Sequence, residues 1–171
     1  MDGVNNMDSV VLLETLKKET ALLVKDLVMP VRMQKGDKEQ LHRVADVYKM
    51  RLPDSTAATK KAPYILHQVI TTSTEQPSGK RVESKVVVRS IFCVYNDDEQ
   101  EGSLMLLNLM ERVRIGLLKK CTIGKMFALD LRQPLEQLVY NEDTAPYYAG
   151  EMITTWTIPA VNRTEEIRQW R

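Results

Sequence analysis

The strongest constraint on the fold of this chain is a pair of apolar segments separated by a short turn. Both segments, residues 64–70 and 82–95, are rich in β-branched and aromatic side chains, which favour strands. Between them, Gln76-Pro77-Ser78-Gly79 places Pro at the second position and Gly at the fourth, as a type I turn prefers. The pattern therefore predicts a β-hairpin.

The second strand of this hairpin is long. Residues 85–95 would span ~36 Å at ~3.3 Å per residue, whereas a usual strand spans ~17–20 Å. Residues 71–84, on both sides of the turn, are mostly polar and include Lys80 and Arg81. We therefore expect the hairpin to project as an arm whose tip, with Lys80 and Arg81, contacts a partner.

Two segments have the periodicity of amphipathic helices. The first runs from Asp8 or Ser9, either of which can cap it, to about Asp26. The second follows the acidic residues 97–101, with Ser103 as the expected cap. The expected buried stripes are Leu12, Leu16, Leu23 and Leu27 in the first helix, and Leu106, Met110, Val113 and Leu117 in the second.

The segment between the first helix and the hairpin is ambiguous. Asp37 and Gln40 resemble a capping box, whereas alternation from residue 44 to Leu52 favours a strand that ends at Pro53. We expect a short helical turn, a strand from about residue 44, and a surface loop over residues 53–62.

Period-two alternation predicts three strands after the second helix, over residues 127–131, 134–140 and 147–158. In the last of these, Glu151, Thr155 and Thr157 share one face. Because this face is polar, we expect it to be exposed.

Together these elements predict an α+β fold, with a mostly antiparallel sheet, a long β-hairpin arm and two amphipathic helices packed on the sheet. The chain has 171 residues, of which 43% are hydrophobic and 27% charged, as in globular domains. We expect one domain over residues 8–160, a flexible N-terminus over residues 1–7 and a C-terminal tail over residues 161–171.

Composition and motifs argue against several classes of function. Lys and Arg total 24 against 23 for Asp and Glu, so the basic excess of a nucleic-acid-binding protein is missing. No apolar run approaches the ~20 residues of a membrane span, and the first residues do not resemble a signal peptide. The seven glycines form no phosphate-binding loop. We expect a soluble, cytosolic protein that is not an enzyme and holds no cofactor or metal.

The histidines and cysteines do not form a convincing catalytic set. His67 is expected to be a hydrogen-bonded structural residue, and His42 to lie on a surface turn. Cys93 could pair with His67 as a nucleophile, but no orienting group or oxyanion loop accompanies them. We expect both cysteines, Cys93 and Cys121, to be reduced.

Three further residues are candidates for contacts with a partner. Tyr147 and Glu151 lie in the segment Pro146-Tyr147-Tyr148-Ala149-Gly150-Glu151, and Trp170 lies in the charged tail. An indole in such a tail either folds back on its own domain or anchors in a partner, and the sequence leaves both open.

Several segments resemble tail terminator (tail completion) proteins of long-tailed bacteriophages and related prophages. The resemblance covers roughly residues 8–160 and leaves the residues from Arg163 onward unmatched. The segments that carry it are Val47-Tyr48-Lys49-Met50-Arg51-Leu52-Pro53, Ala62-Pro63-Tyr64-Ile65-Leu66, Val94-Tyr95, Met105-Leu106-Leu107-Asn108-Leu109-Met110-Glu111-Arg112-Val113-Arg114 and the segment from Pro146 to Glu151.

This resemblance implies a structural virion protein. Its copies would form a hexameric ring at the head-proximal end of the tail tube, stop tube growth and present a surface to the head connector or neck protein. Its partners would be itself, the tail tube protein and the connector, in the host cytoplasm during assembly and then in the virion. No catalytic residues come with the family. The alternatives are another head–tail joining or minor tail protein, or an unrelated small hydrolase or binding domain.

Overall fold

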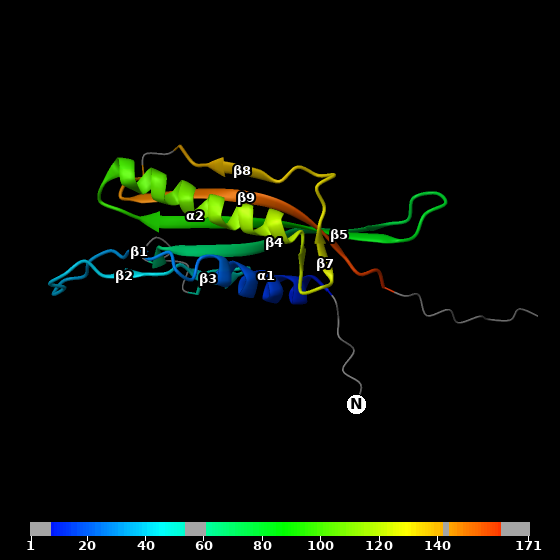
Figure 1. The fold of residues 1–171 in the computed structure, drawn as a ribbon, viewed down its shortest axis with the longest axis horizontal. Helices are drawn as coiled ribbons and strands as arrows, with labels where there is room; N and C mark the ends of the chain where they lie inside the picture. Colours follow the sequence, from blue (N-terminus) through cyan, green and yellow to red (C-terminus); the bar gives the residue numbers. More distant parts are fainter. Residues whose placement is uncertain (1–7, 54–60, 142–143, 162–171) are drawn as a thin grey trace, which may run out of the picture.

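A seven-stranded sheet forms the centre of the molecule, and both helices lie on one of its faces (Figure 1). This computed structural model describes residues 8–53, 61–141 and 144–161. The expected flexible N-terminus, most of the loop after Pro53 and residues 162–171 of the expected tail lie outside the described residues. In chain order the elements are α1 (Ser9–Leu23), β1 (Met29–Pro30), β2 (His42–Arg43), β3 (Asp46–Lys49), β4 (Tyr64–Glu75), β5 (Glu83–Tyr95), α2 (Glu99–Lys120), β6 (Thr122–Ile123), β7 (Phe127–Leu129), β8 (Glu136–Val139) and β9 (Tyr147–Ile158).

The sheet is largely antiparallel, which confirms the predicted α+β fold. Its strand order is β3-β4-β5-β9-β7-β6, and β8 pairs with β9 on the same edge as β7. Among the described strands, the parallel pair is β3 with β4, which the connection from Met50 to Pro63 joins. Leu52 and Ala62, near the two ends of this connection, pack with residues on the face away from the helices.

The main core lies between the helices and the sheet. Helix α1 packs over β3 and β4, and α2 packs over β5 and β9. Alternate residues of β5 point toward the helices, among them Val88 and Phe92, and neither is exposed to solvent. Trp156 of β9 is also fully buried. Each large side chain buried in this way contributes about 1.5–3 kcal/mol.

Each helix is capped by an aspartate. The carboxylate of Asp8 accepts hydrogen bonds from the backbone N–H groups of Val10 and Val11, as one of the two predicted caps. The prediction of Ser103 as the cap of α2 is wrong. The Asp98 carboxylate accepts hydrogen bonds from the N–H groups of Gln100 and Glu101, so the helix begins earlier, at Glu99. The first turn of α2 then contains two acidic residues, which suit the positive end of the helix dipole.

The predicted helical turn around Asp37 is also wrong. Asp37 and Gln34 form a tight turn in which the Asp37 carboxylate accepts from the Gln34 N–H and the Asp37 N–H donates to the Gln34 carbonyl. The side chain of Gln40 donates to the carbonyls of Val31 and Leu41 rather than closing a capping box. The short pair β1–β2 therefore occupies this region, and the predicted strand follows as β3. This strand ends at Lys49 and not at Pro53, because Met50 has a φ of 61°, outside the range of a strand.

The predicted hairpin is present as β4 and β5, but its turn lies one residue later than expected. The N–H of Lys80 donates to the carbonyl of Pro77, so Gly79 is the third turn residue rather than the fourth. Its φ of 71° is a conformation that glycine adopts at low cost. A bulge between Val69 and Thr71 shifts the register of the two strands.

Four further predictions are wrong in the burial of a residue or in the end of a helix or strand. The polar face of β9 is not simply exposed, because Thr155 is buried and the Asp130 N–H donates to its carbonyl. Ala62 is buried rather than part of a surface loop. Leu131 lies beyond β7 and is exposed. Helix α1 ends at Leu23, three residues earlier than expected.

Candidate functional site

His67 has a structural role, as predicted. Its ring lies between α1 and β5, with Nε2 2.9 Å from Thr20 Oγ1 and Nδ1 2.7 Å from Ser90 Oγ. Burial lowers its pKa to about 3, so the ring is neutral at physiological pH. Both ring nitrogens are already used in hydrogen bonds inside the core.

The pair of Cys93 and His67 is not assembled. Cys93 is opposite Tyr64 in the β4–β5 ladder, whereas His67 is opposite Ser90. Because side chains alternate along a strand, Cys93 and Ser90 point to opposite faces of the sheet. Burial raises the pKa of the Cys93 thiol to about 11, which disfavours the thiolate. Cys93 and Cys121 are both free, as predicted.

The described residues contain no cluster of three or more His, Cys, Asp or Glu side chains that could hold a metal ion. A surface hollow of about 660 Å³ lies beside the start of α2 and is lined by residues that include Glu99, Ser103, Leu104 and Tyr148. Among its described lining residues there is no histidine, cysteine or basic group to support catalysis. In the same described ranges, no helix is long and apolar enough to cross a membrane.

The hairpin arm extends past the helices (Figure 1). Strand β9 pairs with β5 from Tyr95 only as far as Ser84, which is opposite Ile158. Beyond that point the hairpin has two strands, and Lys80 and Arg81 are exposed at its tip. Both side chains are therefore accessible to solvent, and their contact with a partner stays a prediction.

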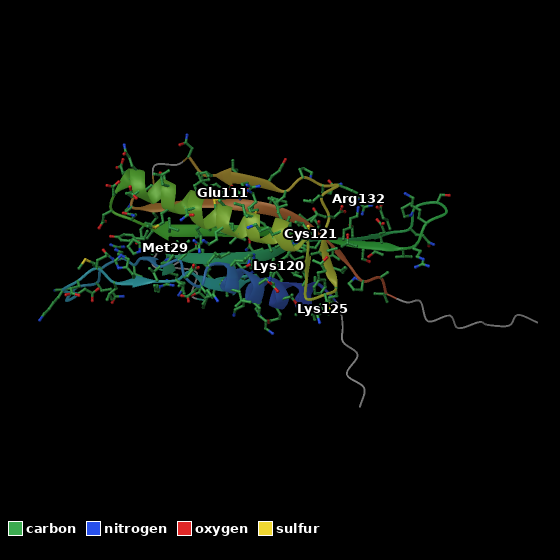
Figure 2. All side chains as sticks on the ribbon, viewed as in Figure 1. Met29, Glu111, Lys120, Cys121, Lys125 and Arg132 are labelled. Carbon is green, nitrogen blue, oxygen red and sulfur yellow. The ribbon has the colours of Figure 1, made fainter. Side chains whose placement is uncertain are left out.

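A charged cluster that the sequence did not reveal fixes the base of the arm. Asp130 is almost buried and accepts hydrogen bonds from the backbone and side chain of Arg132. Its carboxylate also lies 3.3 Å from the Lys85 amine, and Arg132 lies 3.4 Å from Glu83. Figure 2 labels Arg132 near the base of the hairpin arm. Hydrogen bonding from Arg132 lowers the pKa of Asp130 to about 2. The loop after β7 is thereby tied to the first residues of β5.

Tyr147 and Glu151 lie on the face of β9 away from the helices, and both make contacts within the chain. The Tyr147 ring centroid is 5.5 Å from that of Tyr95, and the Tyr147 hydroxyl accepts a hydrogen bond from Arg32. Glu151 accepts from the Tyr140 hydroxyl at 2.9 Å. An ion pair of 3.9 Å joins Glu151 to Arg89 on β5.

The five predicted partner-binding residues therefore do not form one site. Tyr147 is opposite Tyr95, and the arm tip begins beyond Glu83 at the other end of the same strand, about 40 Å away at ~3.3 Å per residue. Lys80 and Arg81 lie together, far from Tyr147. Trp170 lies outside the described residues.

The sequence also missed two open edges of the sheet. Residues 70–75 of β4 have all their side chains exposed, and β3 pairs with β4 only over Tyr64 to His67. On the opposite side of the sheet, β8 exposes Leu138 and Val139. The weak alternation of residues 134–140 predicts a strand, but strand order is needed to place it at an edge.

No protein-family model matches this chain, and no curated protein matches it. Among solved structures, one aligns with 94% of this chain and 100% of its own, at 12% identity and a TM-score of 0.45. Its name describes no function. At this similarity the alignment assigns no activity, substrate or partner.

Proposed function

We propose that this chain is a phage tail terminator subunit. In this role, copies of the chain form a ring at the head-proximal end of the tail tube, end tube growth and provide the surface to which the head attaches. The observation that carries the proposal is the hairpin arm, whose tip, residues 75–83, lies beyond the end of β9 and exposes Lys80 and Arg81 (Figure 1).

Open strand edges support an assembly role. A row of unpaired backbone groups is a template for pairing with another chain, and soluble proteins usually protect such edges. Here the edge residues of β4 include three threonines and a serine and no lysine or proline. The resemblance of residues 8–160 to tail terminators is the reason for proposing a ring at the end of a phage tail rather than another kind of assembly.

The buried histidine and cysteine disfavour the alternative of a small hydrolase. His67 is enclosed by its two hydrogen-bond partners, and Cys93 points to the other face of the sheet. Another head–tail joining protein would share the arm and the open edges. Tail length separates the two structural functions, since a terminator stops tube growth.

Two experiments test the proposal. Light scattering and electron microscopy of the purified protein, alone and with tail tubes, should show rings or tube ends capped by rings. Deleting its gene from the encoding phage or prophage should produce tails of uncontrolled length without heads, and a wild-type copy should restore them. A protein that stays monomeric with tubes, or a deletion that leaves tail length and head attachment normal, would contradict the proposal.

A further inference from the structure

The first of the two open edges belongs to the outer half of β4. On this side of β4, β3 pairs with Tyr64 to His67, and Met50 then covers the next residues, since its sulfur accepts from the Val69 N–H. Beyond the bulge, no described strand pairs with the outer side of residues 70–75. The backbone there is open to another strand.

Hydrogen-bond alternation identifies the groups that point outward from this edge. The His67 carbonyl accepts a hydrogen bond from the Met50 N–H on the β3 side of β4. Because backbone groups of successive strand residues point to opposite sides, those of Leu66 and Gln68 point toward β5. The bulge shifts this parity by one, so that Thr71 and Ser73 face β5. The N–H and C=O groups of Thr72 and Thr74 therefore point away from the sheet.

The second open edge is the outer side of β8. The Tyr140 N–H donates to the Ala149 carbonyl, so Tyr140 and Leu138 face β9 in the ladder. The backbone groups of Gln137 and Val139 consequently point outward. No strand of the described chain pairs with this side of β8.

We propose that these two edges pair with each other between copies of this chain, with the outer half of β4 of one subunit adding to β8 of the next. The inference rests on the self-assembly of the proposed function and specifies how neighbouring subunits join. Each subunit would then contribute one edge of each kind, and the sheets would continue from copy to copy.

Strand direction and side-chain faces agree with this pairing. Strand β4 is antiparallel to β5, β5 to β9 and β9 to β8, so β8 runs antiparallel to β4. Val139 is level with Gly150 in its own sheet, whereas Thr72 is level with Trp156, about 20 Å further along the strands at ~3.3 Å per residue. A neighbour related by rotation therefore presents β8 to the outer half of β4 when the strands are inclined to the rotation axis rather than parallel to it. With Thr72 opposite Val139, Thr74 is opposite Gln137 and their outward backbone groups can form four hydrogen bonds.

The same register places Ser73 opposite Leu138. Both side chains lie on the face away from the helices, since Ser73 is opposite Lys85 and Leu138 is opposite Glu151. The side chains of Thr72 and Val139 lie on the face of the sheet that carries the helices. Pairing therefore extends the sheet without turning a side chain to the wrong face.

A contact between unlike edges is favoured over a contact between like edges. If β8 paired with β8 of a second copy, both subunits would still expose the outer half of β4. A β4–β8 contact removes both open edges and propagates from one subunit to the next, which closes into a ring when the rotation permits.

Disulfide trapping tests this register, in a Cys121→Ser background because the native Cys121 is exposed. Ser73→Cys with Leu138→Cys should form a ladder of covalent oligomers when the assembled protein is oxidised with diamide, because opposite residues on one face come within disulfide reach. The matched control, Ser73→Cys with Val139→Cys, places the thiols on opposite faces and should give at most one-tenth of that yield.

Single-cysteine variants and a second pair complete the test. Ser73→Cys or Leu138→Cys alone should give no oligomer ladder, and efficient dimers from either would show pairing of like edges and overturn the proposal. If the first pair impairs folding, Thr72→Cys with Val139→Cys tests the same register. Rings that form without either cross-link contradict the β4–β8 contact but leave the proposed function standing, whereas a protein that stays monomeric with tail tubes contradicts both.

Discussion

The two halves of β4 lie in opposite environments, one in the core and one in solvent. Tyr64 to His67 are all buried, whereas the six residues from Ile70 to Glu75 are all exposed. The composition changes with the environment, from Tyr-Ile-Leu-His in the buried half to a segment in which four of six residues are threonine or serine. Because threonine keeps strand geometry without needing a buried face, one continuous strand can serve the core at one end and an assembly surface at the other.

The largest expected effect comes from removing the outer half of the hairpin. Deleting residues 74–82 and closing β4 to β5 with a short turn should leave a folded monomer, because the core residues remain, but should abolish ring formation and tail completion. Electron microscopy and complementation of the deleted gene measure these effects. The matched variant Lys80→Ala with Arg81→Ala retains the backbone edge and should only weaken assembly. Normal tails from the deletion variant would show that the arm is not needed for assembly.

In the covered part of the hairpin, Phe92→Ala should destabilise the subunit by about 3–5 kcal/mol, since Phe92 has no exposed surface and the change leaves a cavity. Urea denaturation measures this loss. The corresponding change in the open part, Thr72→Ala, should alter stability by less than about 0.5 kcal/mol, because Thr72 is exposed. Equal losses at both positions would remove the distinction between the two parts.

The sequence was enough to predict the hairpin and both helices, because each depends on local periodicity. It could not reveal that Asp98 rather than Ser103 starts α2, since both are good caps and the choice depends on where the chain leaves β5. The open edges and the burial of Thr155 depend on strand order, which joins residues far apart in the chain. The same holds for the contact between Asp130 and Lys85.

Trp170, outside the described residues, offers a separate test of assembly. Trp170→Ala should weaken ring formation or connector docking by about 2–4 kcal/mol if the indole anchors in a partner. The melting temperature of the free subunit should then stay nearly unchanged. A fall of several degrees would instead indicate that Trp170 packs on its own domain.

At the base of the arm, Asp130→Asn should have a smaller, pH-dependent effect of roughly 1–2 kcal/mol near neutral pH, because Arg132 is exposed and can be rehydrated. The pKa of Asp130 is lower in the folded chain, about 2, than the ~3.9 of an unfolded aspartate. Its contribution is therefore present above pH ~4 and is lost as the pH falls through about 2.

Thermal melts of wild type and Asp130→Asn over this range measure the prediction. The difference in melting temperature should shrink toward pH 2. A difference that is independent of pH would show that the Asp130 charge does not stabilise the base of the arm.

Amide hydrogen exchange at single-residue resolution, in the free subunit and in the assembled particle, compares the two halves of β4 directly. The amide of Ile65, in the part paired with β3, should exchange slowly in both states. The outward amides of Thr72 and Thr74 should exchange rapidly in the free subunit and become protected in the ring, together with those of Gln137 and Val139 on β8. Unchanged, rapid exchange at Thr72 and Thr74 in fully assembled rings would contradict the assignment of the outer half of β4 to subunit pairing.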